Sequence, residues 1–183
     1  MIDLVELICQ TAAEFNEKFE LKELTVVTKL PKTTVFIMAD GRQLYRVIEN
    51  LYNNVAKYAM KKTRVYVEVT SSEENAVFSI KNVSEKSLAQ ENCNAGDLTE
   101  RFIRGDSSRT TEGSGLGLSI AKDLTVLMGG KFDVSVDGDL FKATITFHNF
   151  TEDRVAIAED TAKEGKKPDA NVNGKAEEKE EQL

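Results

Sequence analysis

The stretch Val47-Ile48-Glu49-Asn50-Leu51-Tyr52-Asn53-Asn54-Val55-Ala56-Lys57-Tyr58 combines an apolar stripe with a polar edge at helical spacing. The apolar residues continue back to Leu44 and predict the buried face of one helix. Beside them, Asn50, Asn54 and Lys57 follow at intervals of four and three residues, so their side chains project from one edge of that helix. The helix therefore presents a line of amides and a lysine next to the core.

Capping residues bound this helix and periodicity predicts the elements around it. Asp40 with Gln43 three residues later has the capping-box arrangement, so the helix is predicted to begin there and to end near Ala59. Further helices are predicted at 3–19 and 116–128, and strands at 24–30, 35–38, 64–70, 76–80, 132–136 and 141–147. The residues predicted to share one face of the last helix are Leu116, Ile120, Leu124 and Leu127.

Turn signals and composition divide the chain. Asp137-Gly138 predicts a type I′ hairpin between the last two strands, and Gly129-Gly130 predicts a left-handed helix cap. Residues 83–114 lack periodicity and are interpreted as a long lid, and residues 151–183 have almost no large apolar side chain and are predicted to be disordered. The prediction is one α+β domain at 1–150, a two-layer sandwich whose mixed sheet of about five main strands has three helices on one face.

Charge and cysteine content exclude several classes of protein. The formal net charge is −7, which argues against a nucleic-acid partner or direct contact with an anionic membrane. Cys9 and Cys93 form no CxxC pair, so neither a disulfide framework nor a zinc site is indicated. No apolar run reaches the length of a membrane-spanning helix. A reducing cytoplasmic location is expected.

Several side chains are suited to a nucleotide. An amide oxygen such as that of Asn54 can bind Mg²⁺, Lys57 can meet phosphate, and Tyr58 offers a flat apolar ring. Taken alone, this row is better explained as the solvated flank of a helix. A glycine-rich loop at the start of a helix favours anions, although its small residues could also allow close helix packing. The loop consists of Gly113, Ser114, Gly115, Leu116, Gly117 and Leu118.

In this order the motifs resemble the catalytic ATP-binding domain of sensor histidine kinases, which has the Bergerat ATP-binding fold, over roughly residues 2–147. Residues 47–58 resemble its N box, 100–104 its F box and 113–118 its second glycine box. The resemblance implies Asn54 as Mg²⁺ ligand supported by Asn50, Lys57 on the phosphates and Tyr58 against adenine. It also implies that Phe102 anchors the lid, that Arg104 and Arg109 contact phosphate, and that the loop from Gly113 to Leu118 holds the phosphate tail.

Two positions depart from related patterns. The usual Asp-x-Gly-x-Gly box is replaced by Ile80-Lys81-Asn82-Val83-Ser84, where Asn82 takes the place of the aspartate. An amide can still read adenine, because it both accepts and donates hydrogen bonds. Asn50 stands where the related ATPases carry a water-activating glutamate, and an amide is a poor base. This combination favours phosphoryl transfer over hydrolysis.

The resemblance implies Mg²⁺-dependent transfer of the γ-phosphoryl group of ATP to a histidine on a separate dimerisation domain, with a response regulator served indirectly. Residues 1–20 are interpreted as an exit helix from that domain, and the sole histidine, His148, as structural rather than phosphoacceptor. The parent protein is expected to be cytoplasmic or anchored in the cell membrane. Two alternatives remain open: a nucleotide-sensing or docking module without transfer, and a serine kinase of the anti-sigma-factor type.

Overall fold

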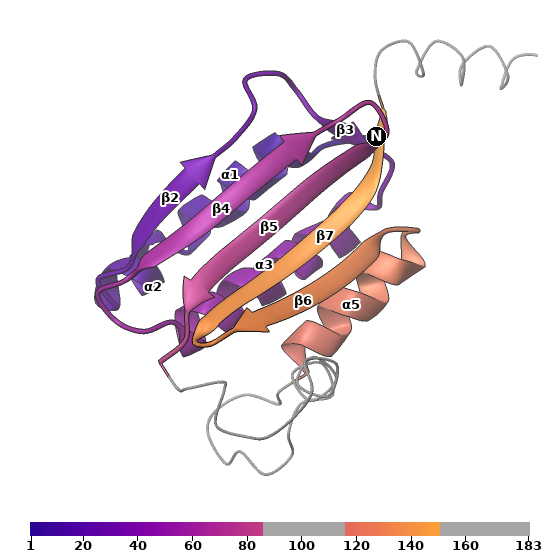
Figure 1. Ribbon diagram of the computed structural model, residues 1–183. Helices are drawn as coiled ribbons and strands as arrows, with labels where there is room; N and C mark the ends of the chain where they lie inside the picture. The colour runs from indigo at the N-terminus through magenta and orange to yellow at the C-terminus, as the bar shows by residue number, and fades with distance from the viewer. Residues whose placement is uncertain (86–115, 151–183) are drawn as a thin grey trace, which may run out of the picture. The chain divides into compact units, whose positions relative to one another are not determined.

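The computed structural model describes residues 1–85 and 116–150, and within those ranges the strands form one seven-stranded sheet (Figure 1). The strand order is β1–β3–β7–β5–β4–β2, and β6 pairs with β7 beside this path; β2 and β4 are parallel and the other pairs antiparallel. The strands are β1 Ile2–Asp3, β2 Thr25–Lys29, β3 Phe36–Ile37, β4 Arg64–Ser71, β5 Asn75–Val83, β6 Lys131–Asp137 and β7 Leu140–Phe150. The helices are α1 Leu4–Glu14, α2 Asn16–Leu21, α3 Gly41–Tyr58 and α5 Gly117–Leu127.

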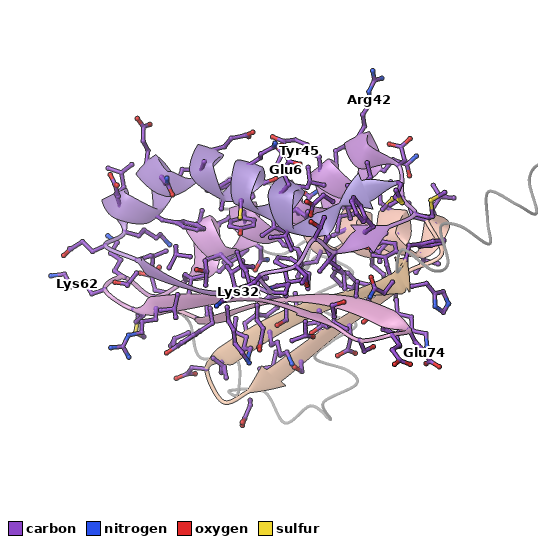
Figure 2. All side chains as sticks on the ribbon, turned by 90° about the horizontal axis from the view of Figure 1, so that it is seen from above. Glu6, Lys32, Arg42, Tyr45, Lys62 and Glu74 are labelled. Atoms are coloured by element: carbon purple, nitrogen blue, oxygen red, sulfur yellow. The ribbon has the colours of Figure 1, made fainter. Side chains whose placement is uncertain are left out.

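The helices cover one face of the sheet, which confirms the predicted two-layer α+β architecture (Figure 1). Seen from above, Glu6, Arg42 and Tyr45 lie on the helical side (Figure 2). The strands supply alternate side chains to the core between the layers, as Val65, Val67 and Val69 of β4 are each at most 3% exposed. The five longer strands and the two-residue β3 were predicted, whereas the two-residue β1 was not.

The first twenty residues pack against the rest of the domain and form a short strand and two helices, where the sequence predicted one helix. Asp3 pairs with Phe36 in the sheet and caps α1, where its carboxylate accepts from the backbone N–H of Val5 at 3.0 Å. The helix then breaks into α1 and α2, and both face the core; their buried apolar residues are Leu4, Ile8, Phe15 and Phe19. The Tyr45 hydroxyl donates to Glu14 at 2.6 Å, which ties α3 to α1 and raises the pKa of Tyr45 to about 12.

The central helix α3 begins as predicted, but only half of its capping box forms. The carboxylate of Asp40 accepts from the N–H groups of Arg42 and Gln43 at 2.9 and 3.0 Å. The side-chain oxygen of Gln43 is buried and has no hydrogen-bond partner in the described part of the chain. The predicted apolar stripe is confirmed as the buried face, with Leu44, Val47, Ile48, Leu51 and Val55 at most 1% exposed.

Tyr52 joins that buried face and is completely inaccessible to solvent. Its ring packs 5.4 Å from Phe15 and 5.9 Å from Phe19, measured between centroids. Its hydroxyl has no hydrogen-bond partner among the described residues, and burial raises the pKa of Tyr52. A buried hydroxyl without a partner costs stability, whereas the ring contributes by packing.

We therefore expect Tyr52→Phe to stabilise the domain. Removal of the hydroxyl should raise the free energy of unfolding by ~1 kcal/mol, because the ring contacts remain and a desolvated polar group disappears. Urea denaturation followed by circular dichroism measures this free energy, and thermal denaturation should show a rise in Tm of about 2–4 °C. A loss of stability of similar size would instead mean that the hydroxyl has a partner in solution.

The buried face of α5 differs from the prediction. The residues that point into the core are Leu118, Ala121 and Thr125, whereas Leu116 and Leu127 of the predicted stripe are 47% and 71% exposed. Small residues are favoured on this face because α5 packs closely against α3. Thr125 is tolerated there because its hydroxyl donates to the Ala121 carbonyl at 2.7 Å.

Glycines end α5 and form the turn of the last hairpin. Gly129 has φ +78° and provides the predicted left-handed cap. Between β6 and β7, Gly138 has φ +57° but Asp139 does not have a positive φ. A type I′ turn requires positive φ at both central residues, so the predicted turn type is wrong; the positive φ at the first central residue alone is typical of type II′.

Candidate functional site

The polar edge predicted for α3 is present in the structure. The side chains of Asn50, Asn54, Lys57 and Tyr58 are half-buried, whereas that of Asn53 in the neighbouring row is exposed. The Asn54 side chain makes no hydrogen bond to another described residue, so none of these residues prevents its amide oxygen from binding a ligand. The Lys57 ammonium lies 5.1 Å from the ring centroid of Tyr58, at the distance of a cation–π contact.

Asn50 and Gly117 bring α3 into contact with the start of α5. The Asn50 amide nitrogen donates to the Arg46 carbonyl at 2.7 Å, which directs the amide oxygen toward α5. That oxygen lies 3.1 Å from where a Cβ atom on Gly117 would stand, so a larger residue would force one side chain to move. The N-terminus of α5 has no side-chain cap within the described ranges. The predicted glycine-loop helix therefore begins directly beside the amide edge of α3.

Asn82 lies in β5 on the face covered by helices and is 1% exposed. Its amide nitrogen donates to the Val83 carbonyl at 3.1 Å, and its amide oxygen is buried without a hydrogen-bond partner among the described residues. Turning the amide over would place the oxygen against the Val83 carbonyl, which is unfavourable. A fixed acceptor without a donor among residues 1–85 and 116–150 is therefore held at this end of the sheet, and such groups in native structures call for an explanation.

The end of β5 and the end of α3 are joined by backbone hydrogen bonds. The Met60 N–H donates to the Val83 carbonyl at 2.9 Å, and the Glu85 N–H donates to the Tyr58 carbonyl at 2.8 Å. Ala59 and Ser84 form an isolated antiparallel bridge between them. Val83 and Ser84 were assigned to the lid from sequence, but these contacts make them part of the sheet. Lys57, Tyr58 and Asn82 consequently come from one joined corner of the fold.

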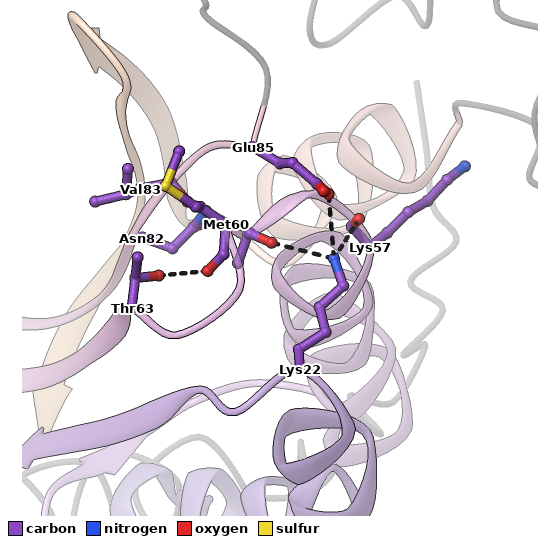
Figure 3. A network of polar contacts seen from close by, with 8 residues as sticks. Lys22, Lys57, Met60, Thr63, Asn82, Val83 and Glu85 are labelled. Atoms are coloured by element: carbon purple, nitrogen blue, oxygen red, sulfur yellow. Dashed lines mark hydrogen bonds and ion pairs between the residues drawn. The ribbon is translucent and has the colours of Figure 1, made fainter.

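Some predicted site residues lie outside the described residues. These are Phe102, Arg104, Arg109, Gly113, Ser114 and Gly115, together with residues 86–115 of the lid and the segment 151–183. Leu116, Gly117 and Leu118 are described, and of these Leu118 is buried in the core while Leu116 is exposed. Sequence reasoning missed Lys22, which binds the end of α3 (Figure 3). No local signal could have identified it, because its partners lie 35 and 37 residues away in sequence.

The donor set is consistent with a Mg²⁺ ion bound mainly through a nucleotide. Within residues 1–85 and 116–150 no group of three or more His, Cys, Asp or Glu side chains could hold a metal ion. The half-buried amide oxygen of Asn54 accepts no hydrogen bond from a described residue, and one such oxygen fits a Mg²⁺ ion whose remaining ligands are phosphates and water. His148 is exposed on β7, opposite Asn75, and does not belong to this group.

Comparison with known proteins agrees with this arrangement. Residues 39–153 match the family model described as histidine kinase-, DNA gyrase B- and HSP90-like ATPase. The chain is 30% identical over 113 residues to the sensor protein GtcS of Aneurinibacillus migulanus, covering 62% of this chain. It is 33% identical over 137 residues to the sensor protein VanSC of Enterococcus gallinarum, covering 74% of this chain. The solved structure of the mycobacterial sensor histidine kinase MprB has a TM-score of 0.66 at 19% identity, covering 81% of this chain and 95% of that chain.

The curated relatives are much longer than the matched region. The chain spans 30% of the length of GtcS and 36% of that of VanSC. Within the described ranges no helix is long and apolar enough to cross a bilayer.

Proposed function

The chain belongs to the family of histidine kinase-, DNA gyrase B- and HSP90-like ATPases. We propose that it acts as the ATP-binding catalytic domain of a sensor histidine kinase, which its similarity to two sensor proteins supports. It binds ATP with Mg²⁺ between the polar edge of α3 and the N-terminus of α5. It then presents the γ-phosphoryl group to a histidine on a separate helical dimerisation domain. The phosphoryl group would pass from there to a response regulator, in the cytoplasm where ATP is available.

The observation that carries this proposal is the contact between Asn50 and Gly117. It places a half-buried amide edge next to a helix N-terminus whose N–H groups favour anions. A polyphosphate needs both parts, since backbone N–H groups bind its oxygens and an amide oxygen can hold its metal ion. Asn54 would hold Mg²⁺, which supplies neutralisation of charge on the transferred group. Lys57 would leave the ring of Tyr58 to meet phosphate, and the ring would then be free to pack against a base.

Asn82 supports adenine as that base. Its fixed and buried amide oxygen can accept a hydrogen bond, and the exocyclic amino group of adenine can donate one. Guanine carries an oxygen at the corresponding position, and two acceptors would then face each other. The nucleotide that fits this corner is therefore an adenine nucleotide.

Asn50 also supports transfer rather than hydrolysis. An amide cannot take a proton from water, and the Asn50 amide nitrogen is already engaged with the Arg46 carbonyl. Phosphoryl transfer then depends on positioning and charge stabilisation, and the attacking group must be a good nucleophile. The histidine of a docked helical domain would meet that requirement.

Two measurements test the proposal. Calorimetry with a nonhydrolysable ATP analogue and Mg²⁺ should detect binding, and no heat up to millimolar nucleotide would reject nucleotide binding altogether. A cognate helical hairpin supplied in trans should acquire acid-labile phosphate from ATP. Binding without transfer would support a nucleotide-sensing module instead, and acid-stable phosphate on a serine would indicate a serine kinase.

A further inference from the structure

Lys22 holds the C-terminus of α3 from outside the helix (Figure 3). Its ammonium donates to the Lys57 carbonyl at 2.8 Å and to the Ala59 carbonyl at 3.1 Å, and it lies 3.9 Å from the Glu85 carboxylate. The Lys22 side chain is 18% exposed, so its bonds to the two carbonyl groups are largely shielded from water, whereas the Glu85 side chain is 54% exposed. A cation at this position also interacts favourably with the negative C-terminal end of the helix dipole.

The backbone around Lys22 is fixed by two turns that contact each other. Glu23 and Lys62 have φ +53° and +62°, and these are the only positive φ values among the described non-glycine residues. The Lys62 N–H donates to the Lys22 carbonyl at 3.0 Å, and the Lys62 and Glu23 side chains form an ion pair at 3.5 Å. Strained backbone of this kind persists only where the surroundings determine it. The backbone position from which the Lys22 side chain extends is therefore well defined.

The carbonyl groups that Lys22 binds belong to the corner that carries the proposed adenine contacts. Lys57 and Tyr58 leave the last turn of α3, and the direction of their side chains depends on how that turn ends. Asn82 lies three residues before Glu85, whose N–H binds the Tyr58 carbonyl. One ammonium thus contacts both sides of the corner, the helix end through two carbonyls and the strand end through a carboxylate.

We propose that Lys22 is a positioning residue for the adenine end of the nucleotide site. It acts through Tyr58 and Asn82, which would contact the base, and it has no contact with the nucleotide itself. The inference rests on the proposed function, since it assigns the base to this corner. Asn50 and Asn54 lie farther back along α3 than the carbonyl groups that Lys22 binds, and the Asn50 amide is held by the Arg46 carbonyl, so we expect the metal side of the site not to depend on Lys22.

The test is Lys22→Met, which keeps most of the apolar stem and removes the donors. At a temperature where the variant is fully folded, its Kd for ATP and its Kd for ADP should both rise about tenfold, equivalent to ~1.4 kcal/mol. The preference for ATP over GTP should fall, while the Mg²⁺ concentration that gives half-maximal ATP binding stays the same. Lys22→Arg, which restores a cation with several donors, should recover most of the affinity.

Lys62→Met is the matched control, because Lys62 lies in the adjoining turn and its 72% exposed side chain pairs with Glu23 alone among the described residues. The substitution keeps the backbone N–H that donates to the Lys22 carbonyl. It should leave both Kd values unchanged. If Lys22→Met fails to fold, Lys22→Gln decides, because its shorter amide can reach at most one carbonyl and should give a smaller loss of the same kind. Lys22 variants that fold and bind ATP and ADP like the wild type overturn the inference. A wild-type protein that binds no ATP rejects the proposed function instead.

Discussion

Replacing Asn54 with alanine should reduce phosphoryl transfer to a helical hairpin by ~100-fold or more while leaving the domain folded. The Asn54 amide oxygen is half-buried and uncommitted to any described residue, so its removal leaves no protein group without a partner. The loss should fall on the metal-dependent part of binding, since an amide oxygen is a Mg²⁺ ligand and a methyl group is not. Transfer assays across a range of Mg²⁺ concentrations would show the variant requiring much more Mg²⁺ or failing to respond.

The neighbouring Asn53 gives a matched control for this experiment. It is an exposed asparagine on the same helix, and its amide oxygen accepts from the Lys18 ammonium at 3.2 Å. Asn53→Ala should therefore change transfer and Mg²⁺ dependence by less than about twofold, as expected for a surface substitution away from the site. If Asn54→Ala behaves like Asn53→Ala, the metal is held elsewhere and the proposed site is wrong.

The sequence predicted α3 well because two independent patterns agree there. Its apolar stripe indicates the buried face, and Asp40 indicates where the helix begins. The face of α5 was predicted wrongly because large apolar residues occur around much of that helix. The close approach of Gly117 to Asn50 decides the matter, and it depends on the absence of a side chain, which a search for leucine and isoleucine does not detect.

The role of the first twenty residues also depends on information that local periodicity lacks. Their spacing correctly indicates helix, yet it does not say which surface the helix covers. Leu4 reaches its place through long-range contacts, since its N–H donates to the Val35 carbonyl and β1 pairs with β3. Lys22 is a polar residue that likewise reaches its place through partners distant in sequence. Pairings that join distant segments determine both outcomes, and neither segment carries a local pattern specific to its partner.

Asn82→Leu should have opposite effects on nucleotide affinity and on stability. Leucine has a similar size but cannot accept the adenine amino group, so the Kd for ATP and the Kd for ADP should rise about 10-fold or more by loss of a buried hydrogen bond. The fold should be unharmed, because the change removes a buried oxygen that has no described partner. The Val83 carbonyl loses the Asn82 amide but still accepts from the Met60 N–H. The free energy of unfolding should therefore stay the same or rise by ~1 kcal/mol.

Calorimetry and thermal denaturation of the same Asn82→Leu sample separate these two effects. We expect weaker nucleotide binding together with an unchanged or higher Tm. General damage to the fold cannot produce this pair of results, because it would lower both the nucleotide affinity and the Tm. Wild-type affinity for ATP in this variant would mean that the buried oxygen serves the fold rather than the ligand. Weaker binding together with a lower Tm would mean that Asn82 has a protein partner in solution, and the base would then have to be recognised by another residue.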